Sequence, residues 1–151
     1  MAESISELLH KISIFSILTD KQIKRVADYI DLIELNQEAT VFFEGWPGEF
    51  VCFVVEGALD VTKKSFTTGM ETNIGTISKG DIVGEMALID NMNRSATVTA
   101  KTDSKLLILT KDKFDKLLNE DPYAGVEILK GIAKNLSFHL RRTWDNLTME
   151  A

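Results

Sequence analysis

The segment GEMALIDNMNRSATV, residues 84–98, places one carboxylate and one guanidinium among small and apolar residues. Arg94 carries a planar fork that can bind two oxygens of a phosphate, more tightly than a lysine could. Glu85 is unsuited to phosphate, but an ionised carboxylate accepts hydrogen bonds from hydroxyl groups. A ligand with both a phosphate and a sugar hydroxyl would satisfy both side chains. The spacing alone also fits a surface ion pair, which contributes only about 0–1 kcal/mol to stability.

The residues around this pair favour an anion site. Gly84 has no Cβ, so the backbone can come close to a ligand there. Residues 85–88 predict one short helical turn at the end of a strand, and a helix N-terminus offers unpaired N–H groups to an anion. Ser95 and Ala96 are small enough to present further backbone N–H groups at the same place.

Motifs for other chemistry are missing from the sequence. It has only His10, His139 and Cys52, too few for a zinc site of the His/Cys type. It contains no G-x-S-x-G, G-x-x-x-x-G-K-[ST] or G-x-G-x-x-G motif. The sequence therefore predicts no enzymatic activity, no metal and no cofactor. His139 by itself is interpreted more readily as a helix-surface residue than as a functional one.

The composition of the chain limits the classes of protein to which it can belong. The chain has 151 residues, 44% of them hydrophobic and 26% charged, which is typical of a globular domain. The net charge of −6 and the lack of a basic run argue against nucleic-acid binding by this chain alone. No stretch approaches the roughly 18 apolar residues of a membrane span, so no membrane association is expected. The N-terminus does not resemble a secretory signal, and one unpaired cysteine is consistent with the cytoplasm.

The elements that must position the pair form a β core between helical ends. Two capping boxes, Ser4 with Glu7 and Thr19 with Gln22, predict short helices at the N-terminus. From about 32 to 109 the chain is rich in β-branched and aromatic runs separated by glycine turns. We expect an α+β fold: one domain over 1–151, an antiparallel β barrel or jelly roll of about eight strands, N-terminal helices and C-terminal helices over about 111–147.

The last helix should begin at Asp121-Pro122, with Asp as the N-cap and Pro in the first position. Its apolar residues alternate at spacings of 3 and 4, which is typical of a heptad seam. Two interpretations stay open, a helix packed on its own barrel and self-association through this seam. We call the following residues the seam: Val126, Leu129, Ala133, Leu136, Leu140, Thr143 and Leu147.

The segment GDIVGEMALIDNMNRSATV, residues 80–98 and here called the cassette, resembles the phosphate-binding cassette of cyclic nucleotide-binding domains. The similarity extends upstream through FEGWPGEFVCFVVEGALDV and downstream through KLLILTKDKFDKLLNEDP. The positions that fit the pattern are Gly80, Asp81, Gly84, Glu85, Ala87, Leu88, Arg94, Ala96, Thr97 and Val98.

The resemblance implies roles for individual residues. Arg94 would pair with the cyclic phosphate, and Glu85 would accept a hydrogen bond from the ribose 2′-hydroxyl. Backbone N–H groups of Ala87 and Ser95 would add bonds to the phosphate. Two hydrophobic residues would line the base pocket, and residues 138–142 of the last helix would close over the base. The expected ligand-binding set is Gly84, Glu85, Met86, Ala87, Arg94, Ser95, Ala96, Val61, Ile74 and His139.

Two positions depart from the family pattern. Val83 replaces a phenylalanine, so the cassette should pack more loosely. An early glycine turn is replaced by Asn36-Gln37-Glu38, where Asn36 is expected to supply the unusual backbone angle. No helix-turn-helix segment follows the last helix within these 151 residues, so a transcription factor is not expected from this chain alone.

The resemblance predicts a regulatory module that binds a cyclic nucleotide, cAMP or cGMP, with cAMP preferred. It would act through its C-terminal helix on a homodimer partner or on an unidentified effector protein. The alternative is a structural or interaction module that keeps the barrel and binds no nucleotide. A third possibility is a segment of a larger channel, kinase or transcription factor, against which a start at Met1 weighs slightly.

Overall fold

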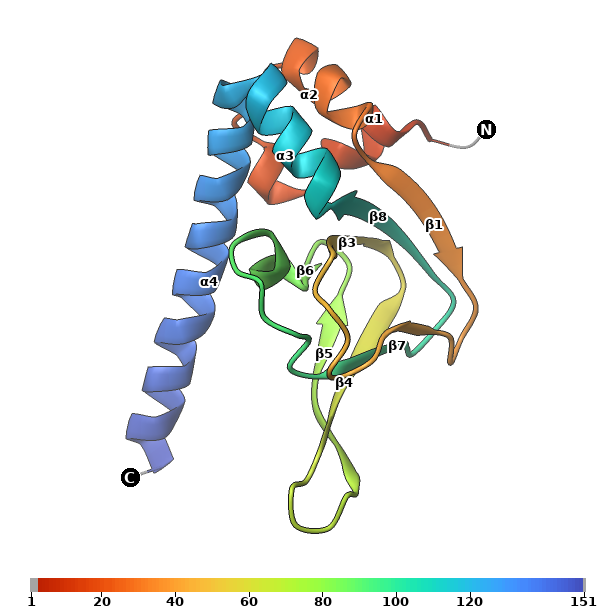
Figure 1. Cartoon of the computed structure of the whole chain (residues 1–151), viewed down its shortest axis with the longest axis vertical. Coiled ribbons are helices and arrows are strands. Elements are labelled where there is room, and N and C mark those ends of the chain that lie inside the picture. The colour runs from red at the N-terminus through yellow and green to blue at the C-terminus, as the bar shows by residue number, and fades with distance from the viewer. Residues whose placement is uncertain (1–2, 151) are drawn as a thin grey trace.

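The computed structural model describes residues 3–150, with helices at both ends and strands between them (Figure 1). The helical elements are α1 (Ile5–Leu9), η1 (Ser13–Phe15), α2 (Asp20–Ala27), η2 (Glu85–Leu88), α3 (Lys111–Glu120) and α4 (Pro122–Glu150). The strands are β1 (Asp31–Leu35), β2 (Thr40–Phe42), β3 (Phe50–Glu56), β4 (Ala58–Lys64), β5 (Glu71–Ser78), β6 (Ile82–Val83), β7 (Thr97–Ala100) and β8 (Ser104–Thr110).

The strands form two antiparallel sheets of four, in the orders β1-β8-β3-β6 and β2-β7-β4-β5. The predicted α+β fold with about eight strands, N-terminal helices and a long C-terminal helix is confirmed. The strands begin at Asp31 and end at Thr110, each within one residue of the expected limit.

Strand β3 is buried on both faces because it separates two apolar cores. Val51, Phe53 and Val55 pack with the helices of the two chain ends. Cys52 and Val54 point the other way, into the interior between the sheets. Burial raises the pKa of the Cys52 thiol to about 12, so this side chain serves as a small apolar residue, as predicted.

The predicted helix starts are present. Ser4 accepts a hydrogen bond from the Glu7 amide at 3.2 Å. Thr19 and Gln22 form a complete capping box, with bonds of 3.2 and 2.8 Å. The turn at residues 36–39 differs from the prediction, because the positive φ (75°) is at Glu38 and not at Asn36. The Ala39 amide donates to the Asn36 carbonyl, and such a turn requires its left-handed residue at the third position.

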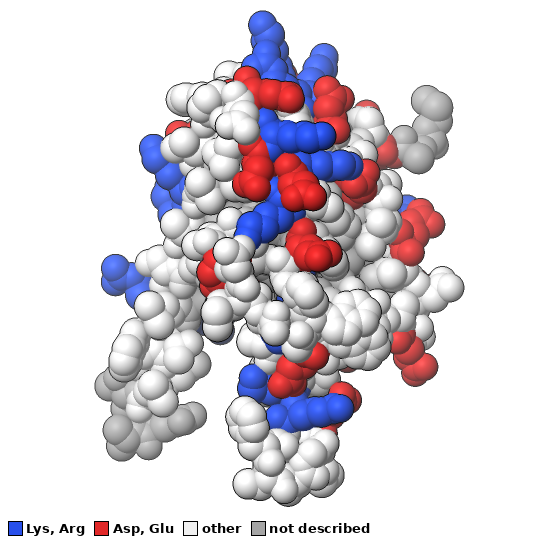
Figure 2. Space-filling view, viewed as in Figure 1, with Lys and Arg blue, Asp and Glu red and all other residues white. Residues whose placement is uncertain are grey.

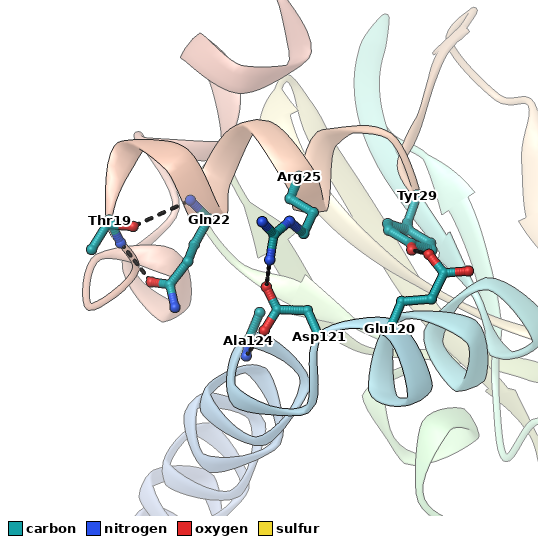
Figure 3. A network of polar contacts seen from close by, with 7 residues as sticks. All are labelled: Thr19, Gln22, Arg25, Tyr29, Glu120, Asp121 and Ala124. Atoms are coloured by element: carbon teal, nitrogen blue, oxygen red, sulfur yellow. Dashed lines mark hydrogen bonds and ion pairs between the residues drawn. The ribbon is translucent and has the colours of Figure 1, made fainter.

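The joint between α3 and α4 is held by one buried carboxylate (Figure 3). Asp121 accepts from Arg25 of α2 at 2.7 Å and from the Ala124 amide at 3.2 Å. Tyr29, just after α2, donates to Glu120 beside this pair. The predicted N-cap at Asp121 and first helical position at Pro122 are confirmed. The same contacts tie the N-terminal helices to the start of α4.

Helix α4 is packed only along its first part. Ala124, Ile128 and Ile132 are fully buried, and none of them belongs to the seam. The helix then continues beside the barrel, toward the end of the molecule where the β4–β5 hairpin lies (Figure 1). Most of the seam is therefore uncovered, and Leu140 is 58% exposed. Two seam residues, Leu129 and Leu136, are partly buried against the core, so the seam lies at the edge of the face that packs on the barrel.

The surface charges are distributed unevenly. Charged side chains of both signs gather over the helical end of the molecule, while the lower part of α4 is largely uncharged on the same face (Figure 2). Among the described residues, no helix combines the length and apolar character that crossing a membrane requires. Within the same part of the chain, no cluster of His, Cys, Asp and Glu side chains could hold a metal ion.

Candidate functional site

The cassette folds as the local sequence predicts. After β6, Gly84 takes a left-handed conformation with φ 78° and ψ 19°, and the short helical turn η2 follows. A Cβ added to Gly84 would lie 2.5 Å from Nη1 of Arg94. Glycine is therefore required here for two reasons: the positive φ angle, and the close approach of the Arg94 guanidinium to the Gly84 Cα.

Arg94 is buried, with 6% of its surface exposed. Its guanidinium donates to the carbonyl oxygens of Phe50 at 2.5 Å and Gly84 at 3.3 Å. Its Cζ lies 3.9 Å from the centre of the Phe42 ring. Nε has no hydrogen-bond partner. The guanidinium is thus held rigidly by neutral groups and keeps an unused donor.

A surface ion pair between Glu85 and Arg94 is not present among the described ion pairs, and Arg94 is not at the surface. That interpretation of the spacing is wrong. Burial lowers the pKa of Arg94, an effect that the nearby carboxylates of Glu49 and Glu85 oppose. A buried cation without a bonded carboxylate is a strong attractor for an anion.

Glu85 is half-buried and faces the last helix. Its Oε1 accepts from Nδ2 of Asn135 on α4, at 3.5 Å. Burial raises the pKa of Glu85, while the Asn135 bond and the nearby His139 and Arg94 oppose this shift. The sequence did not single out Asn135, because nothing local to either segment shows that α4 passes η2. This hydrogen bond joins the cassette to α4.

The raised pKa predicts a pH-dependent stability effect of Glu85→Gln. Above the raised pKa, the folded wild type holds a buried carboxylate at a cost that the amide variant avoids. Below the ordinary pKa of 4.5 the carboxyl is protonated in both the folded and the unfolded chain, so the cost disappears. We therefore expect the variant to melt at a higher temperature than the wild type near neutral pH, by a margin that vanishes as the pH falls to about 4.

Melting curves at several pH values, without ligand, test this prediction. Glu71→Gln on the exposed strand β5 is the control for losing one negative charge. A melting difference between Glu85→Gln and the wild type that stays constant with pH would contradict it.

A cavity of about 340 Å³ opens beside the cassette. Eight of the ten expected ligand-binding residues line it: Val61, Gly84, Glu85, Met86, Ala87, Arg94, Ser95 and Ala96. The cavity combines one guanidinium, the carboxylates of Glu85 and Asp90 and backbone amides with a largely apolar wall, as a ligand with a charged end and a flat apolar end requires. The Ala87 amide already donates to the Gly84 carbonyl at 3.1 Å, so it would share its proton with any ligand.

Two expected residues lie outside this lining. Ile74 is on β5 and 58% exposed, and His139 is exposed on α4. Phe138, 57% exposed, contacts the His139 ring edge-on and does not line the cavity either. The expected lid over the base is therefore displaced from the cavity in this structure.

Some lining residues were missed by the sequence analysis: Phe42, Gly48, Val83, Asp90, Met92, Asn93 and Val98. For Val98 a signal was available, since it alternates with Ala96 along an extended segment and so shares its face. Phe42 and Gly48 come from a distant part of the chain, and no local pattern connects them to Arg94.

Comparison with known proteins gives consistent results. The sequence model of the cyclic nucleotide-binding domain matches residues 32–121. The cAMP-dependent protein kinase regulatory subunit of Aspergillus niger is 33% identical over 110 residues, which are 73% of this chain and 26% of that protein. The regulatory subunit of Yarrowia lipolytica is 36% identical over 110 residues, 73% of this chain and 28% of that protein. The chain spans about a quarter of the length of these relatives.

Solved structures show the same fold. A cyclic nucleotide-binding domain from Methylobacillus flagellatus is similar with a TM-score of 0.85 and 25% identity, over 98% of this chain and 83% of that one. The catabolite activator protein of Thermus thermophilus has a TM-score of 0.77 and 24% identity, over 90% of this chain and 62% of that one. The similarity expected from the cassette is confirmed, and the chain belongs to the cyclic nucleotide-binding domain family.

Proposed function

We propose that this chain is a regulatory module that binds a cyclic nucleotide, with cAMP preferred over cGMP. The observation that carries the proposal is the buried Arg94 with an unused Nε, at a cavity that Glu85 also lines. Arg94 binds the cyclic phosphate, and Glu85 accepts from the ribose 2′-hydroxyl. The amides of Ala87 and Ser95 add bonds to the phosphate, and Val61 contacts the base.

The response to the ligand passes through α4. Asn135 donates to one oxygen of the Glu85 carboxylate, the group that also accepts from the ribose hydroxyl, so a bound ligand and α4 share this side chain. Ile74 and His139 reach the base only if α4 and the β5 region rearrange around the ligand. A ligand shifts such an equilibrium by the difference in its affinity for the two arrangements. The displaced helix then presents a changed surface to a partner protein or to a second copy.

Titration with cAMP, cGMP and AMP tests the proposal. We expect cAMP to bind at least about tenfold more tightly than AMP, since AMP carries an additional negative charge on a free phosphate end, beside the carboxylates of Glu85 and Asp90 that line the same cavity. Calorimetry measures the affinities, and a thermal shift is the rapid screen, because a ligand at 100 times its Kd stabilises by about 2.7 kcal/mol. Equal affinities for cAMP and AMP would overturn this assignment.

One observation favours a second function. The guanidinium of Arg94 already donates to two carbonyl oxygens and lies on Phe42, so it also serves as a structural link between cassette and barrel. A module that uses the barrel for protein interaction would keep this link and bind no nucleotide. The absence of any heat or thermal shift with cAMP and cGMP would support that alternative.

The uncovered seam of α4 predicts a homodimer at micromolar concentration. Val126, Leu140 and Leu147 are 44, 58 and 54% exposed, and a second copy would bury them in a heptad interface. We expect Leu140→Asp to produce monomers in light scattering. Arg141→Asp, which changes the charge more but lies off the seam, should leave the dimer intact. A wild type that is monomeric with and without nucleotide would contradict the prediction.

A further inference from the structure

Lys63 of β4 forms a hydrogen bond with the cassette. Its Nζ donates to the carbonyl oxygen of Ser95 at 2.7 Å. Ser95 itself lines the cavity, as does Val61, two residues before Lys63 on the same strand. Residues two apart on a strand share a face, so Lys63 lies on the same face of β4 as Val61, although Lys63 itself does not line the cavity.

The charge of Lys63 is not neutralised by a neighbour. Among the described ion pairs none involves Lys63, and its only described side-chain bond is to the neutral Ser95 carbonyl. The ammonium therefore keeps two donors and a full positive charge beside the residue that follows Arg94. In a chain of net charge −6, this is a local positive region in a globally negative field.

We propose that Lys63 is a second cationic residue of the phosphate site, a role that rests on the proposed binding of a cyclic nucleotide. It acts in two ways. Its bond to the Ser95 carbonyl fixes the backbone that presents the Ser95 region to the phosphate. Its charge adds to that of Arg94, so that the anion is attracted by two cations from different parts of the chain.

The test compares Lys63→Met with Lys64→Met. Lys64 has the same charge one position further along β4, is exposed, and its backbone amide bonds Glu44 in a way that the substitution preserves. At about 50 mM salt we expect Lys63→Met to bind cAMP about 5- to 30-fold more weakly than the wild type, and Lys64→Met to stay within about twofold. Lys63→Arg should stay within about threefold, because it keeps both the charge and a donor.

Salt dependence separates electrostatic positioning from a merely structural link. At about 500 mM salt the difference between Lys63→Met and the wild type should shrink severalfold, since screening weakens interactions of partly exposed charges. A loss of affinity that does not change with salt, or equal affinities of the Lys63→Met and Lys64→Met proteins, would overturn the inference while leaving the proposed function intact. A wild type that binds no cyclic nucleotide would overturn both.

Discussion

Replacing Arg94 with lysine is expected to weaken cAMP binding by about 10- to 1000-fold. Lysine keeps the charge but loses the planar fork, and therefore the two-point contact with phosphate oxygens. It also cannot supply the Nε donor that is unpaired in this structure. Hydrogen bonds to charged groups contribute about 1.5–3 kcal/mol each, and one or two of them would be lost. Calorimetric titration of wild type and variant measures the change.

The same substitution will lower stability, because Arg94 bonds the Phe50 carbonyl and lies on Phe42. Ile23→Val is the control: it removes one buried methyl group from α2, outside the cassette, for about 0.5–1.5 kcal/mol. This control should melt at a lower temperature than the wild type and bind cAMP with the same affinity.

Glu85→Gln should weaken cAMP binding less than Arg94→Lys, since an amide oxygen still accepts a hydrogen bond from a hydroxyl. Wild-type affinity in the Arg94→Lys protein would end the phosphate assignment.

The second large effect is expected from Gly84→Ala. The new methyl group would lie 2.5 Å from Nη1 of Arg94 and 3.3 Å from the Phe50 carbonyl oxygen, so the guanidinium must leave its position. We expect cAMP affinity to fall by about 10- to 100-fold, as it would if one or two bonds to the phosphate were lost. The left-handed backbone adds a stability cost of about 1–2 kcal/mol.

Gly80→Ala is the matched control for the backbone cost. Gly80 has φ 91°, but a Cβ added there meets nothing within 4 Å. Both variants should lose similar stability from the backbone angle, while only Gly84→Ala should lose affinity. Equal cAMP affinities of the two variants would contradict the prediction that binding depends on the position of the Arg94 guanidinium.

Patterns within a few neighbouring residues were sufficient to predict the secondary-structure elements that carry the site. The capping residues Thr19 and Asp121 predicted helix starts because their bonds are made within three residues. The helical turn after Gly84 was predictable for the same reason, and so was the proximity of the cassette residues that line the cavity. The resemblance to a known family then supplied Val61, which lies on another strand.

Contacts between distant segments could not be predicted in this way. The bonds of Asn135 to Glu85 and of Lys63 to Ser95 span 50 and 32 positions, and they depend on where α4 and β4 pass the cassette. Periodicity revealed the seam of α4, but the buried residues Ile128 and Ile132 belong to a different stripe of that helix. A pattern of apolar residues identifies faces without identifying the partner of each face. The positions of Ile74 and His139 depend on the same long-range geometry.

The buried Asp121 also sets the mechanical behaviour of the last helix. It anchors α4 at its first turn to α2 and α3, and Leu136 is the last residue of the helix that packs against the core. The 14 residues from 137 to 150 extend beyond that support, about 21 Å of helix at 1.5 Å per residue. A rotation of only about 10° around the anchored end would move the far tip of the helix by roughly 7–8 Å, because the whole helix of 29 residues is about 43 Å long. The helix therefore acts as a lever that pivots at Asp121, and a displacement at Asn135, beside Glu85, is about doubled at the far end of the helix.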